Sequence, residues 1–264
     1  MILWCDGAHG AAENMRRDHA LLAAAEAGVE PVLRLFAFAP PSITLGRSQE
    51  PARELDLARC EVDGLEFAVR PTGGRAIFHA QEWTYALAAP LDHPEWGGRA
   101  ADTYERASGL ILRALVRLGV PAGLVARRAP GETPAPRGRG GPAAPCFAST
   151  ARHEVVVEQR KLVGSAQRRT ATAWLQQGSV LLGEGHLRIA DYLAIPDADR
   201  AGVRDSLRRA AGTAGHWLGA APPLERFADA IHAELGLCSS RLEGASGAFL
   251  LTVSGSGSYT APVV

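Results

Sequence analysis

The hydrophobic positions of this chain follow two periods, which predict both helices and strands. Apolar residues recur at helical spacing in residues 12–28 and 99–120, and each of these segments closes at a glycine. In the second segment the apolar stripe consists of Leu110, Ile111, Ala114, Leu115 and Leu118. Shorter helical patterns follow towards the C-terminus, in residues 187–194, 202–212 and 224–236.

Alternating or continuously apolar runs predict strands in several other segments: residues 31–39, 40–46, 65–70, 82–89, 172–182 and the beginning of 247–264. Residues 153–169 favour a hairpin with its turn near Glu158 and Gln159. Strands with helices interspersed and concentrated at the end predict an α+β fold with a mixed or antiparallel sheet flanked by helices.

The composition narrows the class of protein. The 264 residues are 47% hydrophobic, so the chain can bury a sizeable core. Lys+Arg and Asp+Glu both number 28, which argues against nonspecific nucleic-acid binding while leaving room for a local basic patch. No apolar window is long enough to span a membrane, and the N-terminus lacks a secretory signal, so a cytoplasmic protein is expected.

The cysteines and histidines predict neither disulfides nor a metal site. The four cysteines are far apart and form no CxxC pair, so reduced thiols are expected. The histidines do not cluster with carboxylates at metal-ligand spacing. P-loop, dinucleotide-binding and GxSxG hydrolase motifs are all missing from the sequence.

Three segments are candidates for chemistry, and each also has a plain structural interpretation. Paired glycines in residues 70–85 can bring backbone N–H groups close to a ligand, or form a surface turn. Lys161, before a Gly-Ser-Ala turn, can point into a cleft, or be an exposed strand cation. Cys146 needs a nearby cation to be a thiolate, and Lys161 follows it by 15 residues; alone, Cys146 is an inert loop thiol. Cys60 and Cys238 are expected to be packing residues, and Cys5 has no assigned role.

Taken in order, the segments resemble the lipoate-protein ligase and octanoyltransferase family, which is related in fold to biotin protein ligases. The resemblance rests on "AAENMRRDHALL", "PSITLGRSQ", "RPTGGRAIFH..EWTY", "CF......HEVVVEQRKLVGSAQRR" and "LQQGSVLL". It implies one catalytic domain over residues 1–264. The Pro/Gly/Arg-rich composition of residues 129–145 predicts a mobile loop, and the pattern of residues 222–264 predicts a C-terminal helix, strand and tail.

Within the family, "PCFAS" followed by "RKLVGSAQ" is similar to the cysteine-dependent octanoyltransferase branch. The resemblance implies that Cys146 is the nucleophile and that Lys161 lowers the pKa of its thiol. It further implies a substrate site formed by Arg70, Gly73, Gly74, Arg75, His79, Gly164, Ser165, Ala166, Gln177 and Gly178.

The resemblance also implies substrates and partners. Octanoyl moves from acyl carrier protein to a lysine of the glycine-cleavage H protein or a lipoyl domain, without a required cofactor. A monomer is expected because the sequence contains no coiled-coil pattern. Arg127, Arg128, Arg137 and Arg139 are candidates for docking the acidic carrier. Two alternatives stay open: an ATP- and Mg-dependent lipoate-protein ligase, which needs no cysteine, and a noncatalytic carrier-binding protein of the same fold.

Overall fold

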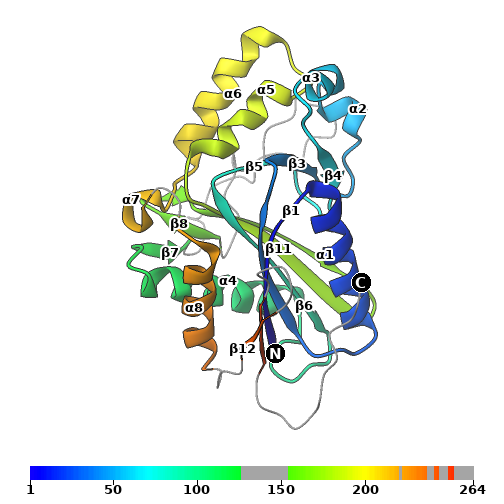
Figure 1. Cartoon of the computed structure of the whole chain (residues 1–264), viewed down its shortest axis with the longest axis vertical. Helices are drawn as coiled ribbons and strands as arrows, with labels where there is room; N and C mark the ends of the chain where they lie inside the picture. Colours follow the sequence, from blue (N-terminus) through cyan, green and yellow to red (C-terminus); the bar gives the residue numbers. More distant parts are fainter. Residues whose placement is uncertain (126–153, 220–221, 237–240, 244–248, 253–264) are drawn as a thin grey trace, which may run out of the picture.

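A mixed seven-stranded sheet forms the centre of the computed structural model, which describes residues 1–125, 154–219, 222–236, 241–243 and 249–252 (Figure 1). The strand order is β10-β11-β6-β2-β1-β13-β12. Only β1 and β2 pair in parallel, and the other neighbours are antiparallel. The strands are β1 Ile2–His9, β2 Val32–Phe38, β6 Glu82–Pro90, β10 Val163–Arg169, β11 Ala173–Leu181, β12 Arg241–Glu243 and β13 Phe249–Thr252.

Two small sheets accompany the large one. The first has the order β4-β3-β5, and the second the order β7-β8-β9. Their strands are β3 Ser42–Leu45, β4 Phe67–Val69, β5 Ile77–His79, β7 Ala122–Leu124, β8 Val155–Val157 and β9 Arg160–Lys161. The first small sheet comes from one stretch of the chain, residues 42–79, whereas the second joins β7 to the hairpin of β8 and β9.

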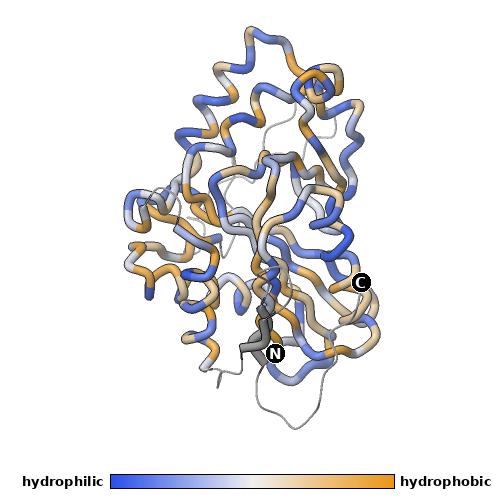
Figure 2. The backbone as a smooth tube through the Cα atoms, viewed as in Figure 1, coloured by the Kyte–Doolittle hydropathy of each residue, from blue (hydrophilic) through white to orange (hydrophobic). Residues whose placement is uncertain are grey.

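Helices cover both faces of the large sheet, and a second group packs beside the small sheets at one end of the molecule (Figure 1). The helices of the described residues are α1 Ala11–Glu26, α2 Pro51–Glu54, α3 Leu57–Val62, α4 Ala100–Arg117, the 3-10 helix η2 Glu184–Arg188, α5 Ile189–Tyr192, α6 Asp197–Ala210, α7 Gly215–Leu218 and α8 Leu224–Leu235. Helix α1 packs on one face with Phe36, Ala86 and Leu175, whereas α4 and α8 pack on the other (Figure 1). Hydrophilic and hydrophobic residues alternate along α8 in Figure 2, as expected of a helix with one buried face.

The expected α+β class with a mixed sheet is confirmed. The two long helices predicted from the sequence correspond to α1 and α4, and the predicted strand at 82–89 corresponds to β6. The predicted hairpin is also present: β8 and β9 pair antiparallel, and Glu158 and Gln159 have φ of 48° and 61° at its turn. None of the helices in the described part of the chain is long and apolar enough to cross a membrane.

One expected strand is divided in two. After β9 the chain leaves the small sheet at Leu162, whose side chain is completely buried, and enters the large sheet as β10. The run from Val163 therefore pairs with β11 and not with the hairpin. The expected mobile loop at 129–145 and the tail after Thr252 lie outside the described residues.

Candidate active site

A pocket lies between the α1-covered face of the large sheet and the small sheet of β3, β4 and β5. It holds about 370 Å³ of empty space, counting its open mouth. Met15 of α1, Phe36 and Phe38 of β2, and Ile77 of β5 give it an apolar wall. The remaining lining residues are Thr44, Arg70, His79, Thr84, Gly164, Ser165, Ala166, Gln177, Gly178 and Ser179.

Most of the substrate-site residues expected from the sequence line this one pocket. Arg70, His79, Gly164, Ser165, Ala166, Gln177 and Gly178 all contribute to its wall, from three separate segments. Gly73, Gly74 and Arg75 form a turn beside it, and a Cβ atom added to Gly74 would lie 3.9 Å from the Cβ of Ala166. Lys161 does not line the pocket, and Cys146 lies outside the described residues.

Arg70 supports the Gly-Gly turn from inside the protein. Its guanidinium donates to the carbonyl oxygen of Gly73 from Nε and Nη2, at 3.1 and 2.8 Å. Nη2 also donates to the carbonyl of Arg75 at 2.8 Å, and Nη1 to that of Thr44 at 3.1 Å. Because a buried guanidinium has five N–H donors and these bonds use most of them, Arg70 holds the turn and is not available as an open anion-binding group.

Gly46 was not predicted as a site residue, but it fixes the position of the same turn. A Cβ atom at Gly46 would lie 2.0 Å from the carbonyl oxygen of Gly74, so no side chain can be placed there. The main chain at Arg47 also donates to the carbonyl of Thr72 at 2.9 Å. The segment "PSITLGRSQ" therefore contributes a backbone surface against which the Gly-Gly turn packs.

His79 is held at the polar end of the pocket by Glu82. Its Nδ1 lies 2.6 Å from Oε1 of Glu82, and its Nε2 lies 2.7 Å from the hydroxyl of Thr44. Since a carboxylate only accepts, Nδ1 carries the proton. Thr84 and Ser179 donate to the same carboxylate oxygen at 2.8 and 2.9 Å. Phe38 stacks on the imidazole with ring centroids 3.9 Å apart, so neither the tilt nor the tautomer of His79 is left to vary.

Glu82, Thr84 and Ser179 were missed by sequence reasoning. They fall within the quoted motifs but carry no distinguishing spacing. Their role becomes visible only when β6 and β11 pair, which brings Ser179 opposite Thr84.

Lys161 is buried beside a carboxylate. Its Nζ donates to Oε1 of Glu154 at 2.5 Å, and both side chains are about 4% exposed. Of the two interpretations left open by the sequence, the exposed strand cation is excluded by this burial, whereas the predicted action of Lys161 on Cys146 stays a prediction. Glu154 was not predicted, although a charged residue opening the apolar run "EVVV" is a signal that could have been used.

Gly178 allows β11 to approach β6 and β10 closely. A Cβ atom there would lie 2.4 Å from Cε1 of Tyr85 and 2.8 Å from Oγ of Ser165. The hydroxyl of Tyr85 bonds to that Ser165 oxygen at 2.8 Å and accepts from the amide of Gln176 at 3.0 Å. Burial raises the pKa of Tyr85, so this phenol stays neutral and acts as a structural hydrogen-bonding group.

Metal ligands do not gather in the described part of the chain. No group of three or more His, Cys, Asp or Glu side chains there is arranged to hold a metal ion.

The chain is similar in sequence and in fold to known proteins. The chain is 38% identical over 204 residues to a protein named octanoyltransferase LipM from Kyrpidia tusciae, covering 77% of this chain and 72% of that one. It is 33% identical over 200 residues to the octanoyltransferase LipM of Bacillus subtilis, covering 74% and 69%. The crystal structure of a lipoate-protein ligase A bound with ATP matches with a TM-score of 0.64 and 16% identity, covering 89% of this chain and 83% of that one, which shows a shared fold.

The family model for the lipoyl protein ligase A/B catalytic domain matches residues 10–236, which include every described residue of the pocket. The chain belongs to the lipoyl protein ligase A/B catalytic domain family.

Proposed function

We propose that this protein is an octanoyltransferase of lipoate biosynthesis, which moves octanoyl from acyl carrier protein to a lysine of a lipoyl-accepting protein through a thioester on Cys146. The observation that carries the proposal is the 38% identity to a protein named as an octanoyltransferase. An apolar-walled pocket on the same stretch of chain supports it. The acceptor is the glycine-cleavage H protein or a lipoyl domain, and the enzyme acts as a monomer.

The reaction proceeds in two balanced steps. The thiolate of Cys146 attacks the octanoyl carbonyl of the donor thioester, a new carbon–sulfur bond forms, and the carrier leaves as its thiol after taking up a proton. The acceptor lysine amine then attacks the thioester on Cys146, an amide forms, the amine loses its proton, and the cysteine thiol is released. Because a thioester is exchanged for a thioester and then for an amide, neither ATP nor a metal is needed.

The pocket walls account for the acyl chain. Met15, Phe36, Phe38 and Ile77 provide an apolar surface for the octanoyl tail, and each buried methylene contributes about 0.8 kcal/mol. The developing oxyanion needs a backbone donor. The Gly74 N–H fits this role, since the Gly73 carbonyl of the same peptide plane points to Arg70 and the N–H therefore points away from it.

Lys161 supplies the buried positive charge for Cys146. A lysine near a thiol stabilises the thiolate, and burial strengthens this effect because the local dielectric is low. Glu154 compensates part of that charge at 2.5 Å, so it sets how strongly Lys161 acts on the thiol.

The test is an intact-mass measurement after mixing the protein with octanoyl-acyl carrier protein in the absence of ATP. An octanoyl adduct that disappears in Cys146→Ser, followed by transfer to H protein, is expected. Acylation of a lipoyl domain that requires ATP and survives Cys146→Ser would instead establish a lipoate-protein ligase. Binding of the carrier without acylation under either condition would establish a noncatalytic adaptor.

A further inference from the structure

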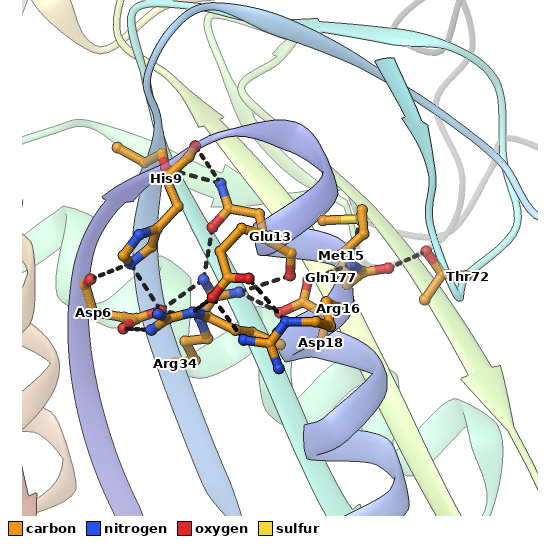
Figure 3. A network of polar contacts seen from close by, with 12 residues as sticks. Asp6, His9, Glu13, Met15, Arg16, Asp18, Arg34, Thr72 and Gln177 are labelled. Atoms are coloured by element: carbon orange, nitrogen blue, oxygen red, sulfur yellow. Dashed lines mark hydrogen bonds and ion pairs between the residues drawn. The ribbon is translucent and has the colours of Figure 1, made fainter. Parts of the chain in front are cut away.

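A buried charge network lies between α1 and the large sheet (Figure 3). Arg34 of β2 is completely buried and donates to Asp6 at 2.7 Å and to Asp18 at 2.6 Å. It also donates to the side-chain oxygen of Asn14 at 2.6 Å. Asn14 and Asp18 come from the motif "AAENMRRDHALL", for which the proposed reaction has no direct use.

The network continues to the pocket wall through Gln177. The side-chain amide of Gln177 donates to Oδ2 of Asp18 at 2.5 Å. Its carbonyl oxygen accepts from the hydroxyl of Thr72 at 2.6 Å. Figure 3 shows Gln177 between Asp18 and Thr72. Thr72 directly precedes the Gly-Gly turn, and Gln177 itself lines the pocket.

The chemistry of these groups fixes the direction of every bond in the chain. Burial raises the pKa of Asp18, and the charge of the Arg34 guanidinium at 2.6 Å opposes that shift and favours the carboxylate. Because a carboxylate only accepts, Gln177 then presents its NH2 group to Asp18 and its carbonyl to Thr72. The Thr72 hydroxyl must then be the donor. Asp18 and Thr72 are completely buried and Gln177 is 7% exposed, so water does not replace these bonds without a cost.

We propose that Asp18, Gln177 and Thr72 are positioning residues, which hold the Gly73-Gly74 turn at the acyl pocket. The inference rests on the proposed function. Arg70 fixes one side of the turn through the Gly73 and Arg75 carbonyls, and the bond from Thr72 to Gln177 fixes the other side against β11. A turn held from both sides keeps its N–H groups in place. Even a small displacement of groups that contact the reacting atoms lowers the rate of the chemical step by a large factor.

The first experiment compares Thr72→Val with Thr72→Ser. Valine keeps the shape but removes the hydroxyl, whereas serine keeps the donor. We expect Thr72→Val to slow single-turnover formation of the octanoyl-thioester by about tenfold, corresponding to roughly 1.4 kcal/mol, while Thr72→Ser stays within about threefold of wild type. Amide hydrogen exchange in the peptide spanning residues 71–76 should accelerate in Thr72→Val only.

The second experiment places the change at the far end of the network. Asp18→Asn keeps the size of the side chain but replaces one carboxylate oxygen by NH2. Because Arg34 is a donor only, the remaining carbonyl faces Arg34 and the NH2 group faces Gln177, which reverses the bond to Gln177. If the residues act as one chain, the effects of Asp18→Asn and Thr72→Val on the acylation rate are not additive, and the double variant is about as slow as the slower single variant.

The outcomes separate this inference from the proposed function. Failure of wild type to form any thioester counts against the proposed function, and the exchange measurement then still decides the positioning role. Equal rates and equal exchange in wild type and Thr72→Val overturn the inference, as does an equal loss in Thr72→Val and Thr72→Ser. Strictly additive effects of Asp18→Asn and Thr72→Val overturn the coupling between them.

Discussion

Gly178 has almost no space around its α-carbon, and this gives a sharp prediction at the scale of one residue. In Gly178→Ala the new methyl would lie 2.4 Å from the ring of Tyr85, which is completely buried and cannot swing away. We expect a loss of about 1–3 kcal/mol in the free energy of unfolding, together with loss of octanoate binding, because β11 must move away from Tyr85 of β6 and Ser165 of β10. Urea denaturation and calorimetry measure the two effects.

Gly202 is the matched control for Gly178. It lies within α6, and a Cβ atom there would meet nothing within 4 Å. Gly202→Ala should therefore stabilise the protein by roughly 0.5–1 kcal/mol through helix propensity. A Gly178→Ala variant as stable as wild type would show that the strands can adjust and that the close approach is not required.

His186 predicts a pH dependence of stability. Burial lowers the pKa of His186 below its ordinary value of 6.5, against smaller raising effects of the Gly183 carbonyl and the Glu82 charge. Below pH 6.5 the imidazole of His186 is therefore protonated in the unfolded chain while it is still neutral in the folded protein. The contribution of neutral His186 to the free energy of unfolding is fully present above pH 6.5 and is lost as the pH falls from 6.5 through the lowered pKa of the folded state.

We expect His186→Gln to make the decrease in unfolding free energy between pH 7 and pH 5 smaller than in wild type. Denaturation curves at several pH values give the measurement. The control is His19→Gln, since His19 is exposed on α1 and its replacement should leave the slope unchanged. An identical slope in wild type and His186→Gln would contradict the prediction.

The hairpin of β8 and β9 carries the next prediction, at the scale of an element. Gln159 is not glycine but has a left-handed backbone conformation with φ of 61°, which is strained. Because its side chain is exposed, packing against other residues does not offset that strain. Gln159→Gly should raise the unfolding free energy by about 0.5 kcal/mol, which is the strain relieved minus the entropy cost of glycine. Thermal denaturation measures it.

Glu158→Ala serves as the comparison for this turn. It removes an exposed ion pair to Arg160 and leaves a non-glycine residue at φ of 48°, so a change below about 0.5 kcal/mol is expected. If Gln159→Gly lowers the free energy of unfolding instead, the side chain of Gln159 stabilises the folded protein by more than its backbone strain costs.

The elements also show which features the sequence can predict. Helix α4 was predictable because its apolar stripe is regular, and the hairpin because polar residues separate two short apolar runs. The division between β9 and β10 was not predictable, because residues 160–169 form one continuous strand-like pattern and only the burial of Leu162 between two sheets separates them. Local pattern determines the type of an element but not the sheet that it joins.

The same limit applies to the site. The Gly-Gly turn and the lysine strand were predictable from motifs that resemble a family. The polar partners on other elements were not, because they come from distant strands and helices: Gln177 meets Thr72 across 105 sequence positions and Asp18 across 159. A polar residue on the buried face of α1 has no distinguishing mark until Arg34 is placed beside it.

At the scale of the whole molecule, unpaired positive charge gathers around the Gly-Gly turn. Arg47 and Arg75 flank the turn, and Arg168 follows Ala166 on the same face of β10, since alternate residues of a strand share a face. Within the described residues none of the three forms a salt bridge, whereas most of the exposed arginines elsewhere do. The protein as a whole has a formal net charge of zero, so this surface is a local feature that suits an acidic carrier.

The double variant Arg47→Glu/Arg75→Glu should therefore raise KM for octanoyl-acyl carrier protein by about tenfold or more and reduce its salt dependence. With octanoyl-pantetheine, a donor that lacks the acidic protein, KM should rise by a clearly smaller factor. Arg209→Glu makes the same kind of charge reversal on α6, which contributes no residue to the pocket, and should leave both donors unaffected. Steady-state kinetics with the two donors at low and high salt provide the test.

An equal rise in KM for both donors would place the two arginines in contact with the acyl-pantetheine group itself. Unchanged kinetics with the carrier would mean that it docks on another surface.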